Sequence, residues 1–321
     1  MTQEPGHSPI LSKPLLLSLL VSVLSVLSIN TTLATEPSPG RRVMTWVPPY
    51  AVADCEKRLN ESFDGVGLKD GITHLSLQFW NPTKNGGLQF VTRFGLKGEA
   101  TVPKFRKWGT KHGVRVMLCV YNAKSSGWDW NLARFAFETN RTKFVKALVD
   151  ETLRLKLDGI DIDFEGKEER DGSQAPFIRF VAELSSRLHA AGKELSVDSF
   201  AYKWNAPNQT WWPELLPHVD GLIVMGYSET GAGAERWRSY DFVKSAAGNH
   251  ASKILLGMPG HKGKWQNSSV TKHLQWVLNE DSVGVAIWDA RLRDSAWRTK
   301  ATWETIKRIK TGTKPGSKSE E

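Results

Sequence analysis

"LDGIDIDFEG" (residues 157–166) places three acids two positions apart in a stretch that otherwise has the composition of a buried strand. Alternate residues of a strand point to the same side, so Asp161, Asp163 and Glu165 share one face and the apolar residues between them share the other. A fold that covers the apolar face on one side therefore gives the three acids a common interior on the other.

Seven further apolar runs recur along the chain, separated by stretches with helical periodicity. The eight predicted strands are 42–48, 72–80, 113–122, 157–166, 194–200, 219–227, 253–260 and 283–290. Several are continuous apolar runs, which is typical of strands covered on both faces. Helices are predicted at 140–156, 174–192, 270–280 and 296–310. Strands alternating with helices in this way predict an α/β fold, a single (β/α)8 TIM barrel over residues 42–310.

A doubly wound open sheet is the competing fold. It would need a glycine-rich phosphate-binding turn after an early strand, and the sequence has none. The chain of 321 residues is 40% hydrophobic and shows no internal repeat and no linker within residues 42–310, so one domain is expected. In a barrel the apolar face of 157–166 packs on the helices, and Glu165 falls at the C-terminal end of the fourth strand, where barrel active sites are built.

The N-terminus has the order of a secretory signal peptide. Lys13 precedes an apolar run of roughly 16 residues, and small residues up to Ala34 suit a cleavage site. The sequence predicts a signal peptide at 1–34, a short linker at 35–41, a secreted barrel and a disordered tail at 311–321. The alternative is that the apolar segment stays uncleaved and anchors the protein to a membrane.

Charge and cysteine content narrow the partners and cofactors. The formal charge is +9, but the basic residues are scattered, so nucleic acid is not predicted as a partner. Cys55 and Cys119 permit at most one disulfide, and Cys119 lies in an apolar strand, as a buried thiol would. No zinc-type spacing occurs, and neither a metal nor a cofactor is expected. We expect a monomer.

Asn-x-Ser/Thr triplets, which favour a glycosylating pathway, begin at Asn30, Asn60, Asn140, Asn208 and Asn267.

The three acids of the fourth strand repel one another. Carboxylates two residues apart are about 7 Å apart, which gives roughly 2.4 kcal/mol of repulsion per ionised pair at an effective dielectric near 20. That energy corresponds to about two pKa units. A dry interior therefore cannot hold all three as carboxylates near neutral pH, and at least one proton is shared. The arrangement provides a general acid beside a negative charge.

Two other interpretations of the acidic strand are weaker. A solvent-facing acidic strand conflicts with neighbouring runs that are apolar on both faces. A calcium-binding loop starting at Asp161 would need a bidentate glutamate at its twelfth position, and Gly172 stands there.

The run from Asp158 to Glu165 resembles the D-G-x-D-x-D-x-E signature of glycoside hydrolase family 18, the chitinase family. The resemblance extends over most of the predicted barrel. "VMGY", ending at Tyr227, resembles the sixth-strand M-x-Y of that family, "GMPG" is similar to its seventh-strand G-x-P, and "VAIW", ending at Trp288, resembles its eighth-strand tryptophan. Asp158 and Gly159, which precede the inward-facing acids, are expected to be structural.

The resemblance implies retaining hydrolysis of β-1,4-linked N-acetylglucosamine glycans by substrate-assisted catalysis. Glu165 would protonate the glycosidic oxygen while the N-acetyl carbonyl oxygen of the substrate attacks the anomeric carbon, giving an oxazolinium intermediate. Asp163 would orient the acetamido N–H, and Asp161 would share a proton with Asp163. Tyr227 would hold the acetamido oxygen through its hydroxyl.

Aromatic side chains fall at or just beyond the C-terminal ends of several predicted strands. The chain has 14 tryptophans, and flat rings at that rim suit the C–H faces of sugars. Trp288 is predicted to form the floor under the reacting sugar. The predicted substrate-binding residues are Trp288, Trp46, Trp80, Tyr121, Asn122, Met225 and Trp204, and Trp265 is a further aromatic at the same rim.

The sequence also departs from the family pattern. "CVYN" (119–122) replaces the usual third-strand S-x-G-G, and Ser228 stands where an aspartate often follows M-x-Y. Residues 260–282 leave room for one helix, so the insertion domain of many chitinases is absent. These departures leave endo-β-N-acetylglucosaminidases and peptidoglycan hydrolases open as alternatives. A catalytically silent chitinase-like lectin is the alternative from another class, although silent members typically replace the acid and Glu165 is in place.

Overall fold

The computed structural model of the chain describes residues 40–92, 94, 96, 98–125, 127–166, 172–201, 206–230, 234–265 and 270–313. The predicted signal peptide, most of the predicted linker and residues 314–321 of the predicted tail lie outside the described residues. Among the helices that are described, none is long and apolar enough to cross a membrane.

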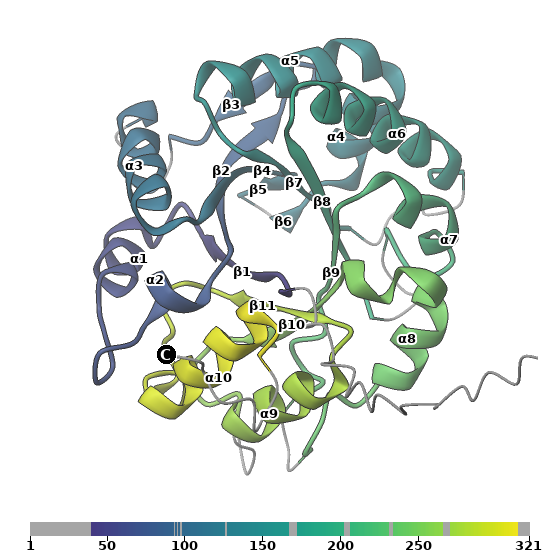
Figure 1. Cartoon of the computed structure of the whole chain (residues 1–321). Coiled ribbons are helices and arrows are strands. Elements are labelled where there is room, and N and C mark those ends of the chain that lie inside the picture. The colour runs from purple at the N-terminus through teal and green to yellow at the C-terminus, as the bar shows by residue number, and fades with distance from the viewer. Residues whose placement is uncertain are drawn as a thin grey trace, which may run out of the picture. The chain divides into compact units, whose positions relative to one another are not determined.

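Eight parallel strands form a closed barrel (Figure 1). They are β1 (Val43–Val47), β2 (His74–Pro82), β4 (Arg115–Tyr121), β7 (Gly159–Asp163), β8 (Glu194–Ser199), β9 (Gly221–Val224), β10 (Ile254–Pro259) and β11 (Gly284–Trp288). The first strand pairs with both β2 and β11, which closes the sheet. The predicted (β/α)8 barrel is therefore confirmed, and all eight predicted strands are present.

Helices surround the barrel (Figure 1). They are α1 (Val52–Leu59), α2 (Leu68–Gly71), α3 (Val102–His112), α4 (Trp130–Arg134), α5 (Arg141–Arg154), α6 (Gln174–Ala190), α7 (Trp212–Leu215), α8 (Tyr240–Ala247), α9 (Val270–Glu280) and α10 (Lys300–Thr311). The last helix includes Thr311, one residue beyond the predicted end of the barrel, and ends at Gly312, whose φ of 72° suits a helix C-terminus. Between β10 and β11 the described chain contains α9 and no insertion domain.

Three short strands were missed by the sequence analysis. β3 (Leu88–Phe90) pairs antiparallel with β2, and β5 (Ala123–Lys124) pairs antiparallel with β6 (Gly127–Trp128) just after β4. The small β5–β6 hairpin follows a strand C-terminus, so it belongs to the same end of the barrel as Glu165.

Alternate strand residues separate into two apolar layers. Outward residues such as Leu75 and Leu77 of β2 and Ile160 and Ile162 of β7 pack against the helices in the outer core. Each such fully buried side chain contributes roughly 1.5–3 kcal/mol. The inner cluster is small and consists of Met44, Trp46, Cys119, Ile223, Leu255 and Ala286, with Met225 and Trp288 packed against it. Many other inward positions carry polar groups.

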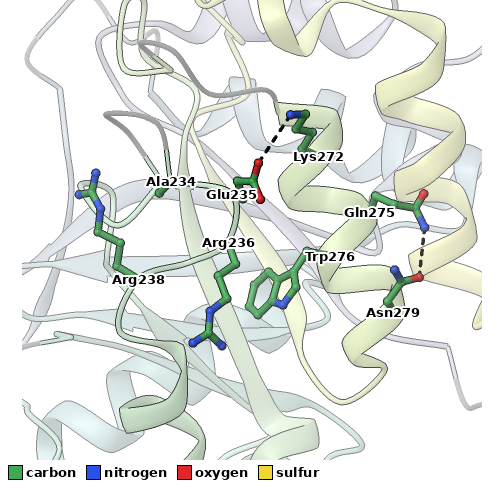
Figure 2. Close-up of a pocket in the computed structure, with 8 residues that line it drawn as sticks. All are labelled: Ala234, Glu235, Arg236, Arg238, Lys272, Gln275, Trp276 and Asn279. Carbon is green, nitrogen blue, oxygen red and sulfur yellow. Dashed lines mark hydrogen bonds and ion pairs between the residues drawn. The ribbon is translucent and has the colours of Figure 1, made fainter.

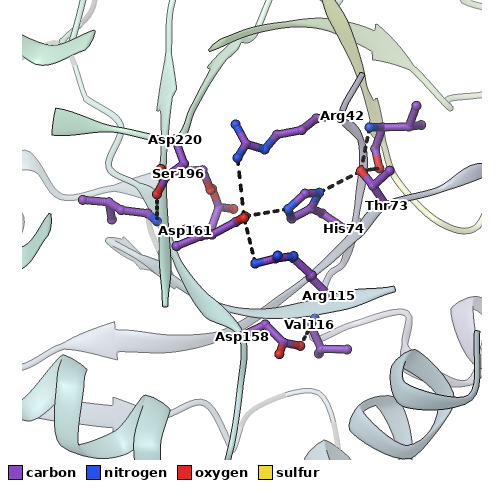
Figure 3. Close-up of polar contacts among 12 residues, drawn as sticks. Arg42, Thr73, His74, Arg115, Val116, Asp158, Asp161, Ser196 and Asp220 are labelled. Atoms are coloured by element: carbon purple, nitrogen blue, oxygen red, sulfur yellow. Dashed lines mark hydrogen bonds and ion pairs between the residues drawn. The ribbon is translucent and has the colours of Figure 1, made fainter. Parts of the chain in front are cut away.

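A charged cluster lies at the N-terminal end of the barrel (Figure 3). Glu194, the first residue of β8, lies 2.8 Å from His74 Nε2, 2.7 Å from Arg115 and 3.6 Å from Arg42. Burial alone would raise the pKa of Glu194, but the hydrogen bond from His74 and the charges of His74, Arg42 and Arg115 lower that pKa to about 2. Asp158 accepts a hydrogen bond from Val116 N at 2.8 Å in the same region, so its carboxylate caps the backbone of β4.

Gly159 allows two strands to approach closely. A Cβ atom at this position would collide with the carbonyl oxygen of Glu194 and lie 2.6 Å from Met117 Cε. Any larger residue here would push β8 away from β7, the strand that carries the acids. The two cysteines of the chain, Cys55 and Cys119, are both buried and free.

Candidate active site

Strand β7 directs its acids into the barrel. Asp161 and Asp163 are 0% and 2% exposed, whereas the alternating Ile160, Ile162 and Phe164 belong to the outer core. Two carboxyl groups in so dry an interior require compensating hydrogen bonds or protonation.

Three donors surround Asp161. Trp46 Nε1 and Ser76 Oγ donate to its Oδ2 at 2.8 and 2.7 Å, and Ser196 Oγ donates to its Oδ1 at 2.6 Å. Burial raises the pKa of Asp161, and the hydrogen bonds from Ser196, Ser76 and Trp46 oppose that rise without cancelling it. Asp161 is thus the acid of β7 whose negative charge is stabilised by the most hydrogen bonds.

Asp163 has less support. Gln78 Nε2 donates to its Oδ2 at 2.6 Å, and no group among the described residues bonds its Oδ1. Burial raises the pKa of Asp163 to about 7; the Gln78 hydrogen bond opposes this, and the negative charge of Asp161 adds to it. The carboxyl groups of Asp163 and Glu165 interact directly. A group with a pKa near neutrality beside a second carboxyl is suited to exchanging a proton with it.

Glu165 lies just beyond the end of β7, where its backbone is held by Asn122. The side-chain Nδ2 of Asn122 donates to Glu165 O at 2.7 Å, and Asn122 Oδ1 accepts from Glu165 N at 2.9 Å. Burial raises the pKa of Glu165 well above its ordinary value, and the negative charge of Asp163 raises it further. The structure therefore offers a carboxylic acid that keeps its proton near neutral pH.

Tyr227 and Trp288 lie at the same end of the barrel. Tyr227 follows β9 and is half-buried; burial raises the pKa of its hydroxyl well above the usual value, and the nearby Asp198, Asp163 and Glu165 carboxylates raise it further. Trp288 ends β11, is half-buried, and its ring centroid lies 5.7 Å from that of Trp46. These rings and acids converge on one end of the barrel interior.

This convergence agrees with a comparison of sequences. A profile of glycosyl hydrolases family 18 matches residues 49–314. The chain belongs to this family. A curated relative from Moniliophthora perniciosa, a "chitinase-like effector", is 27% identical over 168 residues, covering 47% of this chain and 37% of the relative. The chain thus spans well under two thirds of that relative.

Solved structures agree with the family fold. A chitinase from Bacteroides thetaiotaomicron superposes with a TM-score of 0.64 at 16% identity, covering 88% of this chain and 99% of that one. The Bacillus cereus spore cortex-lytic enzyme SleL superposes with a TM-score of 0.61 at 14% identity, covering 84% of this chain and 74% of that one. At these identities the likeness concerns the fold.

Several predicted binding aromatics of this family member are structural. Trp80 is 1% exposed, packs in the outer core and donates from Nε1 to Glu151 at 3.2 Å, so its prediction as a binding residue is wrong. The cause is a register shift between Gln78 and Trp80 that reverses the alternation of β2. Trp265 is also core, because it is 6% exposed and bonds the carbonyl of Pro259.

Other predicted binding residues have different positions. Trp46 is fully buried and its indole N–H is bonded to Asp161, so it supports an acid and offers no open platform. Asn122 is likewise fully buried and bonded to the Glu165 backbone, so it positions the acid. Met225 is half-buried against the inner cluster. Trp204 lies outside the described residues.

The rim after β4 carries an aromatic pair. Tyr121 is opposite Asp163 in the β4–β7 register, is 3% exposed and lies edge-to-face with Trp128 at 6.3 Å. Trp128, in the short hairpin, is 37% exposed and was not predicted. His261 was also missed, and its ring stacks on Tyr227 at 6.5 Å. Nothing in the linear pattern distinguishes these two residues from other surface residues.

Sequence analysis missed most of the groups that support the acids. Ser76, Gln78 and Ser196 bond Asp161 or Asp163, and Asp198 adds a fourth buried carboxyl. A signal was available: in β2 and β8 these polar residues alternate with apolar ones, as inward-facing positions of a barrel strand would. The described residues contain no group of three or more His, Cys, Asp or Glu side chains that could hold a metal ion.

A separate hollow of about 1040 Å³ lies between residues 234–238 and α9 (Figure 2). Its polar side chains pair with each other: Lys272 lies 3.8 Å from Glu235, and Gln275 donates to Asn279 at 3.1 Å. The single acid there, Glu235, is 84% exposed. A hydrolytic mechanism that needs interacting buried carboxyls is supported at β7 and not here.

Proposed function

We propose that this protein is a secreted, retaining glycosidase that cleaves β-1,4-linked N-acetylglucosamine glycans such as chitin or chitooligosaccharides. The observation that carries the proposal is Glu165: its backbone is fixed by Asn122, it interacts with Asp163, and its pKa is raised well above the ordinary range. A carboxyl that remains protonated near neutral pH beside a second carboxyl is what a general acid requires.

In the first step Glu165 gives its proton to the glycosidic oxygen, and the bond from that oxygen to the anomeric carbon breaks. The carbonyl oxygen of the substrate's own N-acetyl group forms a bond to the same carbon, which gives an oxazolinium ion. Asp163 accepts the acetamido N–H and stabilises the positive charge, and Tyr227 donates its hydroxyl to the acetamido oxygen. Asp161 shares a proton with Asp163, so that Asp163 can be ionised when it stabilises this charge, and Trp46, Ser76 and Ser196 donate hydrogen bonds to Asp161.

In the second step the Glu165 carboxylate removes a proton from water. The water oxygen attacks the anomeric carbon from the side that the leaving group vacated, and the bond to the acetamido oxygen breaks. Glu165 is protonated again, and the product keeps the β configuration because the carbon has been inverted twice. No separate enzymatic nucleophile is needed, since Asp161 and Asp163 lie deeper in the barrel than Glu165.

Two other substrate classes and one other function class compete. The likeness to a spore cortex-lytic enzyme supports peptidoglycan as an alternative substrate, and an N-glycan core would suit an endo-β-N-acetylglucosaminidase. The relative described as a chitinase-like effector supports a sugar-binding protein without turnover. Glu165 in place, with its supporting residues, favours the catalytic alternative.

The deciding experiment incubates the purified protein with chitooligosaccharides, a glycopeptide carrying the N-glycan core, and peptidoglycan, with products sized by mass spectrometry. We expect the protein to cleave the chitooligosaccharides. The Glu165→Gln variant should lose turnover and keep oligosaccharide binding, because its amide cannot donate the required proton. Binding of all ligands without cleavage by the wild type would establish the lectin alternative, and substantial hydrolysis by folded Glu165→Gln would refute the acid assignment.

Partly deacetylated chitosan tests the nucleophile. A glucosamine unit has no carbonyl oxygen and carries a positive charge where another must develop in the transition state. Every new reducing end should therefore carry an N-acetyl group and be released as the β anomer, as read by NMR. Glucosamine at new reducing ends would exclude the substrate-assisted mechanism.

Export is a separate part of the proposal, supported by the leader-like order of residues 1–34. Expression of the full chain in a secreting host, followed by N-terminal sequencing of the protein in the medium, tests it. A mature N-terminus close to Ala34 is expected, and retention of the full chain in the membrane fraction would favour the uncleaved anchor.

A further inference from the structure

A fourth carboxyl group lies in the barrel interior beside the three acids of β7. Strand β8 lies between β7 and β9 in the sheet. Asp161 is opposite Ser196 in the register of β7 with β8, and Ser196 Oγ bonds Asp161 inside the barrel. Asp198 is two residues further along β8, so it points the same way and lies level with Asp163. It is 2% exposed.

Asp198 lacks the support that its neighbours have. Its Oδ1 has no hydrogen-bond partner among the described residues, whereas Asp161 accepts from three donors and Asp163 from Gln78. An ionised carboxylate buried without donors would be strongly destabilised. Asp198 can therefore offer its open oxygen to a ligand only if its carboxyl group is neutral.

Among the described residues, the titratable groups that interact with Asp198 are all acidic or neutral. Asp161, Asp163 and Glu165 from the β7 side act on it, Tyr227 faces it from beyond β9, and Cys119 faces it from β4. No cation is among these groups. Burial raises the pKa of Asp198 well above its usual value, and the three carboxylates raise it further. Its own effect on Tyr227 is the largest among the carboxylates.

We propose that Asp198 is a substrate-binding residue: a neutral carboxylic acid whose O–H donates a hydrogen bond to the N-acetyl carbonyl oxygen of the sugar, alongside the hydroxyl of Tyr227. The inference rests on the proposed function and deepens it. The carboxyl lies between Asp163, which is proposed to take the acetamido N–H, and Tyr227, which is proposed to take the acetamido oxygen. A carboxylate would repel that oxygen, whereas a carboxylic acid binds it.

Three variants test the proposal. Asp198→Asn keeps the size of the side chain and a donor but cannot ionise, and Asp198→Leu removes the donor. We expect Asp198→Asn to retain kcat/KM on chitooligosaccharides within about 3-fold, and Asp198→Leu to lose on the order of 10- to 100-fold, the range for one buried hydrogen bond. Asp198→Ala serves in place of the leucine variant if thermal unfolding shows that the latter does not fold.

The pH profile separates this role from a structural one. If Asp198 is neutral, replacing it with asparagine removes no negative charge, and the alkaline limb of kcat/KM should not move to lower pH. If Asp198 is ionised, the same substitution would lower the pKa of Glu165 and move that limb down by about one unit or more. Such a shift, or an asparagine variant as impaired as the leucine variant, overturns the proposal.

A measurement independent of turnover distinguishes failure of the inference from failure of the proposed function. With 13C-labelled aspartate carboxyls, the Asp198 signal is assigned by its loss in Asp198→Asn. Its chemical shift should be that of a protonated carboxyl at neutral pH, and a carboxylate shift would overturn the inference even in an active enzyme. If the protonated signal is found but the wild type neither binds nor cleaves N-acetylated sugars, the proposed function fails and the binding role of Asp198 fails with it.

Discussion

The side-chain amide of Asn122 is bonded to both backbone polar atoms of Glu165, donating to its carbonyl at 2.7 Å and accepting from its N–H at 2.9 Å. Asn122 follows β4 and Glu165 follows β7, and these two strands are neighbours in the barrel. The proposed acid lies beyond the last ladder pair of its own strand, so its position depends on this pair of hydrogen bonds. Asn122, which was predicted from the sequence to bind substrate, is thus a positioning residue.

Asn122→Ala should reduce turnover more than substrate binding. The substitution leaves two partly buried backbone groups of Glu165 without these partners, at up to about 1–3 kcal/mol each, and lets Glu165 move away from the glycosidic oxygen. We expect kcat to fall by 10-fold or more with KM changed by less than about 3-fold. Asn60→Ala is the control, since Asn60 is exposed and its side chain donates to the carbonyl of Glu56 in α1. Equal losses in the two variants, or a change in KM alone, would argue against the positioning role.

Asp163→Asn should stabilise the protein at neutral pH and not at acid pH. The pKa of Asp163 is raised from 3.8 to about 7, so its contribution to stability is present below the unfolded value and is lost as pH rises through the folded value. The asparagine variant cannot ionise, so its unfolding free energy does not fall in this way as pH rises. Gln78 can still donate to its amide oxygen. We expect a gain in unfolding free energy on the order of 3–4 kcal/mol at pH 8 that fades towards pH 4.

Urea unfolding at both pH values measures this gain. Asp150→Asn, on the outer face of α5 with a side chain 58% exposed, is the control and should change stability little at either pH. A stability difference between wild type and Asp163→Asn that is the same at pH 4 and pH 8 would show that Asp163 is ionised at little cost. The test needs no substrate, so it stands apart from the proposed activity.

The sequence predicted the barrel because the physical signals for it are local. Several strands are continuous apolar runs, and the period-two alternation of residues 160–165 fixes which side the acids face. The same reasoning failed at Trp80, where one irregular residue in β2 reverses the alternation and turns the ring into the outer core. A bulge leaves no clear mark in the composition of the strand.

The supporting residues could not be identified from the sequence because they come from other strands. Trp46, Ser76 and Ser196 meet at Asp161 only through the closure and register of the barrel. Asp198 carried a weak local signal, an acid two residues after a serine in a strand where polar and apolar residues alternate. Its significance becomes clear only when β8 is placed beside β7.

Trp288 and Trp80 should respond in opposite ways to substitution. Trp288 is half-buried at the end of β11, and Trp288→Ala should weaken binding of chitooligosaccharide by about 1–3 kcal/mol if the ring stacks on the sugar. Trp80→Phe replaces the core indole with a smaller ring and removes its bond to Glu151, so it should lower stability by about 1–2 kcal/mol and leave affinity unchanged. Calorimetry in a Glu165→Gln background, which prevents turnover, measures the affinities. Unchanged affinity in folded Trp288→Ala would make Trp288 a packing residue.

Glu194→Gln should destabilise the protein with a pH dependence opposite to that of the acids at the other end of the barrel. The pKa of Glu194 is lowered from 4.5 to about 2, so its stabilisation is complete above the unfolded value and is lost as pH falls through the folded value. The glutamine variant should be about 3 kcal/mol less stable than wild type at pH 7, because Arg42, His74 and Arg115 lose the carboxylate that they share. The difference in stability should narrow steadily below about pH 4.5.

Glu56→Gln is the matched control, since the Glu56 side chain is 45% exposed and lies 3.8 Å from Lys104. This variant should lower stability by less than about 0.5 kcal/mol at any pH. A Glu194→Gln deficit that persists unchanged at pH 3 would mean that the cluster acts through shape and neutral hydrogen bonds. If the stability difference between wild type and Glu194→Gln instead disappears at acid pH, one end of the barrel favours ionised carboxylates while the other favours protonated ones.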